Sequence, residues 1–145
     1  MESSEIRDVL READRAEAAP WVEFPPTPWW YVPVASLWAG ALVLALAFDS
    51  QALFLALVAA ELLFLAWYRR YRGLWPTGKA PRELRWPIVA LVAGLAVAIG
   101  ATLLVHDLAG PWWAAVTMTL TTAGILAWYE RAYVAAARRT QERLA

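Results

Sequence analysis

Four long apolar stretches dominate the pattern of hydrophobic and polar positions along the chain. They run near residues 30–48, 52–67, 86–105 and 112–128. About 20 apolar residues in a helix are needed to cross the roughly 30 Å hydrocarbon layer of a membrane, and each stretch approaches that length. The sequence therefore predicts an all-α membrane protein with four transmembrane helices. The alternative is a soluble bundle, but so short a chain has too little polar surface to cover four buried apolar helices.

The polar segment before the first stretch predicts an amphipathic helix over residues 3–18. Its apolar side chains recur at helical spacing, at Ile6, Val9, Leu10, Ala13 and Ala16. Ser3 or Ser4 suits the N-cap. The segment lacks the apolar core of a signal peptide, so we expect the first stretch to be retained. A Pro-rich, extended connection over residues 24–30 completes a cytoplasmic unit, residues 1–29.

Positive charges flank the apolar stretches on one side. The loop over residues 68–85 carries Arg69, Arg70, Arg72, Lys79, Arg82 and Arg85 against Glu83, and the tail carries Arg131, Arg138, Arg139 and Arg143. Loops rich in Lys and Arg stay in the cytoplasm. The loop and the tail are therefore expected inside, and four crossings place both termini inside. This predicts a multi-pass protein of the plasma (inner) membrane.

The fourth stretch is expected to continue as one helix through the tail. Neither Gly nor Pro follows Gly124, so nothing interrupts the helix across residues 130–145. At 1.5 Å per residue the tail would project roughly 20 Å into the cytoplasm. Residues 30–129 then form the transmembrane bundle between two cytoplasmic ends.

The two halves of the chain resemble each other, which indicates an internal repeat. Residues 33–40 align with residues 87–94, and the Leu-Ala-Trp-Tyr at 65–68 aligns with that at 126–129. Both halves begin inside, so they form two tandem hairpins in a parallel repeat. The second half holds seven more residues, expected in its outer loop. Chance similarity between Ala/Leu-rich segments is the alternative explanation.

Small residues at matching places suggest how the hairpins pack. Ser36 and Gly40 in the first stretch correspond to Ala90 and Gly94 in the third, and such small-xxx-small pairs let helix backbones approach closely. The fourth stretch has a stripe of small and polar residues that includes Thr117, Thr121 and Gly124. Its threonines are expected to hydrogen-bond across helices.

Composition supports a membrane protein and excludes cysteine chemistry. Hydrophobic residues make up 61% of the chain, against about 45–50% in soluble domains. No cysteine is present, so disulfides and thiolate metal sites are excluded. Arginine far outnumbers lysine, of which Lys79 is the sole example, and we interpret this bias as bacterial.

The N-terminal helix is acidic, which bears on its partner. Seven acids face three arginines between Glu2 and Glu23. Helices that lie on anionic membranes are rich in Lys and Arg, so lipid is a poor target for this helix. It either docks on the basic loop of its own chain or presents Ile6, Val9 and Leu10, with Ala13, to another protein.

Glu61 is the one carboxylate inside a predicted span, and intramembrane ionisable residues are usually functional. Ala52, Ala56, Ala59 and Ala66 share one side of this helix. If the alanine side packs into the bundle, Glu61 faces outward with Phe54, Leu57 and Leu65. Glu61 would then contact a partner or a second copy, stay protonated, or reach the inner interface near Arg69 or Arg72.

Other candidate sites are weak. His106 and Asp107 in the outer loop make too small a set for a metal site, and Asp49 suits a turn between two spans. No nucleophile with a base, phosphate loop or metal cluster is visible, so neither catalysis nor a cofactor is expected. Nucleic acid is excluded as a partner because no soluble basic domain is present.

Two function classes remain. The first is a non-catalytic accessory subunit or adaptor that acts through contacts with a partner membrane complex or with itself as an oligomer. The alternative is a small homodimeric proton-coupled transporter that uses Glu61. Four spans with a single membrane carboxylate superficially resemble the small multidrug-resistance exporters. Those proteins place their glutamate in the first span and lack such a charged N-terminal helix, so the chain is not assigned to that family.

Overall fold

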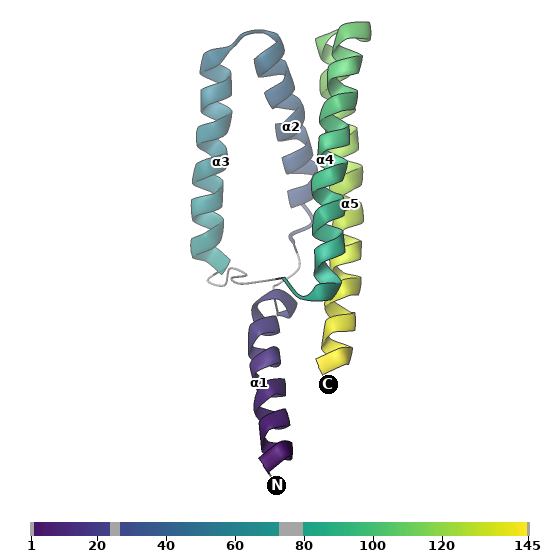
Figure 1. The fold of residues 1–145 in the computed structure, drawn as a ribbon. Helices are drawn as coiled ribbons and strands as arrows, with labels where there is room; N and C mark the ends of the chain where they lie inside the picture. The colour runs from purple at the N-terminus through teal and green to yellow at the C-terminus, as the bar shows by residue number, and fades with distance from the viewer. Residues whose placement is uncertain (1, 24–26, 73–79, 145) are drawn as a thin grey trace.

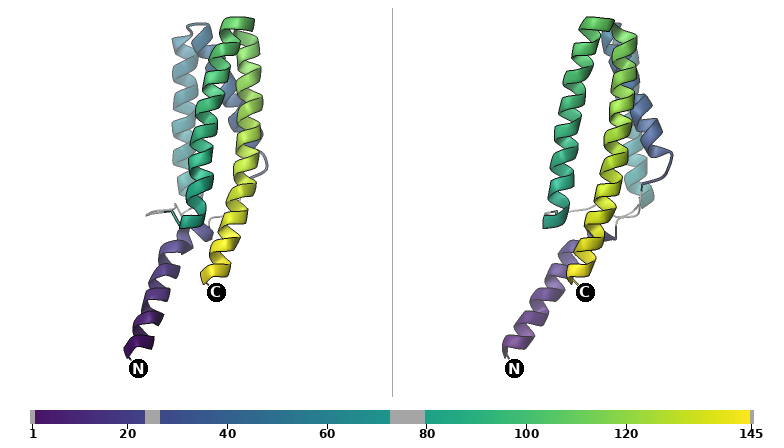
Figure 2. Two further views of the ribbon diagram at one scale, coloured as in Figure 1. Left: turned by 45° about the vertical axis from the view of Figure 1, so that its right-hand side comes forward. Right: turned by 90° about the vertical axis from the view of Figure 1, so that its right-hand side faces the viewer.

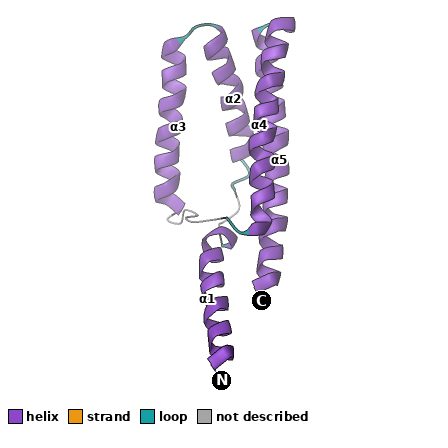
Figure 3. Ribbon diagram, in the orientation of Figure 1, coloured by secondary structure: helices purple, strands orange, loops and turns teal. Residues whose placement is uncertain are grey.

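The protein consists of helices joined by short connections. The computed structural model describes residues 2–23, 27–72 and 80–144. Five helices follow in order: α1 (Glu2–Val22), α2 (Tyr31–Ala47), α3 (Gln51–Arg72), α4 (Arg82–Ala109) and α5 (Pro111–Leu144). The described residues include no strand, as Figure 3 shows. The predicted all-α class is therefore confirmed.

The longest helix, α5, lies at the centre of the packing. It packs along α4 and α2 and also contacts the end of α1, whereas α3 contacts α2 and none of the other described helices. Figures 1 and 2 show α2 and α3 as one hairpin and α4 and α5 as the other, with both chain ends at the same end of the molecule. The hairpins meet through α2 and α5, so the four helices do not close into the compact bundle expected from the sequence.

The turn between α2 and α3 is set by Asp49. Its φ of 49° lies in the left-handed region, which Asp tolerates better than most residues. The Ser50 N–H then donates to the Ala45 carbonyl at 2.9 Å, which satisfies one of the last carbonyls of α2. The turn role expected for Asp49 is confirmed.

The turn between α4 and α5 is shorter than expected. Gly110 alone separates the helices, with a φ of 89° and an N–H that donates to the His106 carbonyl at 3.0 Å. His106 and Asp107 therefore lie in the last turns of α4 and not in a loop. The expectation that extra residues lengthen the outer loop was wrong: because one glycine makes the turn, α4 extends further beyond Pro87 than α2 does beyond Pro33.

The tail is part of one continuous helix, as the sequence predicted. It is not a free projection, however, because α4 begins at Arg82 and its first turn lies against the tail. Leu84 and Thr140 are fully buried there, and Ala136 is nearly so. The start of α4 thus covers the C-terminal turns of α5.

The N-terminal helix runs past its predicted end to Val22 and includes Pro20. Pro20 has no N–H to donate to the carbonyl four residues earlier, so the last turns of α1 lack one hydrogen bond. The N-cap predicted at Ser3 or Ser4 was wrong, because α1 begins at Glu2 and both serines lie inside its first turn. The extended geometry predicted for residues 24–26 lies outside the described residues. The described part of the Pro-rich connection bends, since the Tyr31 N–H donates to the Pro28 carbonyl at 2.9 Å.

Two helices are long and apolar enough to cross a membrane. They are α3, within Gln51–Arg70, and α4, and only 6% and 11% of their most apolar windows are buried inside the protein. The remaining apolar surface of these helices points outward. Such surface is stable in hydrocarbon and costly in water, which suggests a membrane location.

Candidate functional site

Glu61 faces the inside of the α2–α3 hairpin, which corrects its predicted direction. The half-buried residues of α3 are Phe54, Leu57, Val58, Glu61, Phe64 and Tyr68, whereas Ala52, Ala56, Ala59 and Ala66 are exposed. The alanine side therefore does not pack into the bundle. Larger side chains occupy the inner face of the hairpin instead.

Aromatic rings fill the end of that hairpin that lies opposite the turn at Asp49. The Phe64 ring lies 6.0 Å from Trp30, 6.3 Å from Tyr31 and 5.8 Å from Tyr68, between ring centroids. Edge-to-face and offset contacts at such distances stabilise aromatic pairs by about 0.5–1.5 kcal/mol each beyond their burial. Higher in the hairpin, the Trp38 Nε1–H donates to the Leu57 carbonyl at 3.2 Å. These contacts set which face of α3 turns inward.

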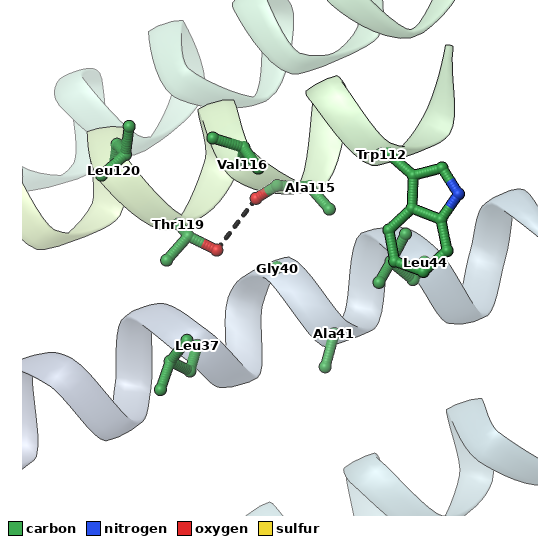
Figure 4. Close-up of a pocket in the computed structure, with 9 residues that line it drawn as sticks. All are labelled: Leu37, Gly40, Ala41, Leu44, Trp112, Ala115, Val116, Thr119 and Leu120. Atoms are coloured by element: carbon green, nitrogen blue, oxygen red, sulfur yellow. Dashed lines mark hydrogen bonds between the residues drawn. The ribbon is translucent and has the colours of Figure 1, made fainter.

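Gly40 marks the close approach of α2 to α5, shown in Figure 4. A Cβ added at Gly40 would collide with the Thr119 hydroxyl and lie 3.0 Å from the Ala115 carbonyl oxygen. Ser36, one turn earlier, is also buried, and its hydroxyl donates to Val32 of its own helix at 2.7 Å. A shallow apolar depression of about 360 Å³ lies beside this contact.

The other residues predicted to pack behave differently. Ala90 and Gly94 are half-buried, and a Cβ at Gly94 would meet Ile125 at an ordinary 3.5 Å. Gly124 is exposed, with nothing within 4 Å of an added Cβ, so the stripe proposed on α5 is not a packed face along its whole length. Thr121 does not bond across helices. Its hydroxyl donates to the Thr117 carbonyl at 2.7 Å, inside α5.

A cavity of about 600 Å³ opens at the end of the hairpins nearest α1, and residues of all five helices line it. Its aromatic lining comes from Trp21, Tyr31, Phe64, Tyr68, Tyr129 and Tyr133. The Tyr133 hydroxyl donates to the Trp21 carbonyl at 2.6 Å, and burial raises the pKa of this phenol to about 12. The phenol therefore remains a proton donor throughout the physiological pH range.

Two polar atoms at this cavity are buried without a hydrogen-bond partner, Glu130 Oε1 and Trp21 Nε1. From the sequence, Glu130 lay in the tail and had no expected role. The paired Leu-Ala-Trp-Tyr segments held the signal that could have found it. Where the first Leu-Ala-Trp-Tyr is followed by Arg69, the second is followed by Glu130, which reverses the charge at equivalent places.

The apolar stripe of α1 is uncovered. Ile6, Val9 and Leu10 are 59%, 65% and 59% exposed, and Ala13 is exposed as well. By contrast, Ala18 near the end of α1 is buried, because only this end packs against α5. The described helices α3 and α4, which flank the basic loop, make no contact with α1.

Within the described parts of the chain, no three His, Asp or Glu side chains come together as a set that could hold a metal ion. No known protein family, curated protein or solved structure matches the chain.

Proposed function

We propose that the protein is a non-catalytic, four-pass subunit or adaptor of the plasma membrane that acts by contact with a partner membrane protein or with a second copy of itself. The uncovered stripe of α1 carries this proposal. Three large apolar side chains, Ile6, Val9 and Leu10, stand exposed on a helix fastened only at its other end. An amphipathic helix with such a stripe fits an apolar groove on another protein, and its acidic character disfavours anionic lipid.

The membrane orientation has separate support. Both termini lie at the end of the molecule that carries the basic flanks, and the apolar surfaces of α3 and α4 point outward. The shorter apolar helix α2 runs beside α5, and we assign a crossing to each of the four. Both termini are then cytoplasmic.

Capture from the native membrane tests the adaptor role. The tagged full chain would be extracted in mild detergent and its partners identified by mass spectrometry. A stoichiometric second polypeptide, or a dimer of the chain, should be lost in an Ile6→Ser/Leu10→Ser variant. It should persist in Asp8→Ser, which alters the opposite face of the same helix. Equal recovery of the partner with both variants would contradict a role of α1 in binding it.

A second candidate function, proton-coupled transport by a homodimer, is favoured by the inward direction of Glu61. A half-buried carboxylate inside a membrane hairpin is suited to binding and releasing a proton. In liposomes, Glu61→Gln should abolish substrate-driven proton movement without lowering the melting temperature. Transport at the wild-type rate by that variant would contradict a role of Glu61 in proton-coupled transport.

A further inference from the structure

The cavity around Glu130 combines features that select one kind of ligand. Six aromatic side chains line it, and a carboxylate oxygen lies buried beside them without a hydrogen-bond partner. A buried acceptor atom that lacks a hydrogen-bond partner is unfavourable, so Glu130 Oε1 is suited to a donor or a cation. The faces of aromatic rings attract ammonium groups in the same way.

We propose that this cavity binds an amphiphile by its ammonium group, which the Glu130 carboxylate and the surrounding aromatic rings hold, while the apolar tail lies along Leu91 and Leu126. Tyr129 and Tyr133 flank Glu130 on α5, with ring centroids 5.8 Å apart. Tyr31 and Tyr68 approach from the other hairpin. Rings from both hairpins thus line the same cavity as Glu130.

The lining of the cavity changes in polarity along α5, which is why an amphiphile fits. Leu126 lies about one turn before Glu130, and Arg138 and Gln141 lie about two and three turns beyond it. Its volume of about 600 Å³ lies in the range of roughly 300–1,000 Å³ that is typical of small-molecule sites. Side chains of both hairpins line the cavity, although among the described helices α3 packs against α2 and not against α4 or α5.

The charge distribution favours a cation over an anion at the centre of the cavity. Among the described residues that line the cavity, Arg138 is the one basic residue, and it lies two turns beyond Glu130 with an exposed side chain. Glu130 and the aromatic rings are therefore suited to an ammonium group. A phosphatidylethanolamine headgroup and a free alkylammonium compound share this chemistry and are the two sources.

This inference goes beyond the proposed function and takes from it only the membrane location. The purified full chain would be released from a non-ionic detergent and analysed by native mass spectrometry. The probes are phosphatidylethanolamine and decyltrimethylammonium, and phosphatidylglycerol with matched acyl chains is the ammonium-free control. We expect a single bound ammonium probe, with Glu130→Gln weakening its binding about tenfold or more. Glu142→Gln, exposed on the same helix, should change nothing.

The probe whose binding depends on Glu130 distinguishes the two possible sources of the ammonium group. Glu130-dependent binding of phosphatidylethanolamine alone identifies a lipid site, and Glu130-dependent binding of decyltrimethylammonium alone identifies a site for a free amphiphile; either supports the proposal. If the Glu130→Gln variant does not fold, substitutions of Tyr129 provide the test instead. Tyr129→Leu should lose the probe and Tyr129→Phe should keep it, because the ring face supplies the attraction. Equal binding of phosphatidylglycerol, or no difference between the wild type and these variants, would overturn the proposal.

Discussion

The hydroxyl of Tyr133 donates a 2.6 Å hydrogen bond to the carbonyl of Trp21, across 112 residues of sequence. This contact ties the end of the N-terminal helix to the middle of α5. Nearer the start of α1, the described side chains of Ile6, Val9 and Leu10 remain exposed. The Trp21 end of α1 is thus attached to α5 while this apolar stripe is uncovered, an arrangement suited to reaching a partner.

Removing this hydroxyl should loosen α1 and leave the hairpins intact. A buried neutral hydrogen bond contributes about 1 kcal/mol, and Tyr133→Phe leaves the Trp21 carbonyl without its donor. We expect faster amide hydrogen exchange over α1 with unchanged exchange in α4. Tyr129→Phe is the matched control, because the structure shows no hydrogen bond from that hydroxyl among the described residues. Equal effects of the two variants would contradict the role of the bond.

The same contact predicts a weakening of α1 attachment at high pH. Burial raises the pKa of Tyr133 from 10.0 to about 12, so the folded state favours the protonated phenol. Its contribution is fully present below pH 10.0 and is lost as the pH rises through about 12. Amide exchange is too fast for a measurement there, so the ultraviolet titration of the phenols in wild type and Tyr133→Phe is the suitable test. The variant should lack the highest-pH component.

Gly40 should be far less tolerant of substitution than Gly124. Gly40→Leu forces α2 away from Thr119 and Ala115, and overpacking of this kind costs about 1–3 kcal/mol. Gly124→Leu places the same side chain where nothing lies within 4 Å. Thermal unfolding in detergent should show a lower melting temperature for the first variant only. A similar fall for both would mean that the α2–α5 contact is looser than the structure shows.

Glu83 should make the packing of α4 on the tail sensitive to acid. It forms an ion pair with Arg143 at 2.9 Å and accepts a hydrogen bond from Thr140 at 3.3 Å. A backbone hydrogen bond and the Arg143 charge hold the pKa of this carboxyl below its ordinary 4.5. Its contribution is therefore present above pH 4.5 and disappears as the pH falls through the lower folded value.

The expected size is that of a partly exposed ion pair, about 0.2–1 kcal/mol. In the wild type, the protection of the tail amides against hydrogen exchange should fall between pH 6 and about pH 3. This fall should be smaller in Glu83→Gln. Glu142→Gln, which the structure leaves exposed, serves as the control. An unchanged pH dependence in Glu83→Gln would assign the acid sensitivity to other groups.

Four crossings can be tested directly because the chain contains no cysteine. Single cysteines at exposed Glu23, Gln51, Arg70 and Leu108 can be labelled with an impermeant maleimide in intact cells. Gln51 and Leu108 should react from outside, whereas Glu23 and Arg70 should react only after the membrane is opened. The same sidedness at Glu23 and Gln51 would mean that α2 does not cross.

The sequence by itself determined the helices and much of their extent. Long apolar stretches predict helices whatever they pack against, and polar residues that interrupt them predict turns, such as the one at Asp49. The continuous α5 was found correctly because neither Gly nor Pro follows Gly124. Only the tertiary structure decided which face of each helix is covered. Helical periodicity shows that Glu61 and the alanines of α3 lie on opposite sides, but both sides are apolar enough to face lipid or protein. The aromatic contacts between α2 and α3 turn the side with Glu61 toward α2.

Glu130 became a candidate site for the same reason. It shares its cavity with Trp21, Tyr31 and Tyr68, which lie far from it along the chain.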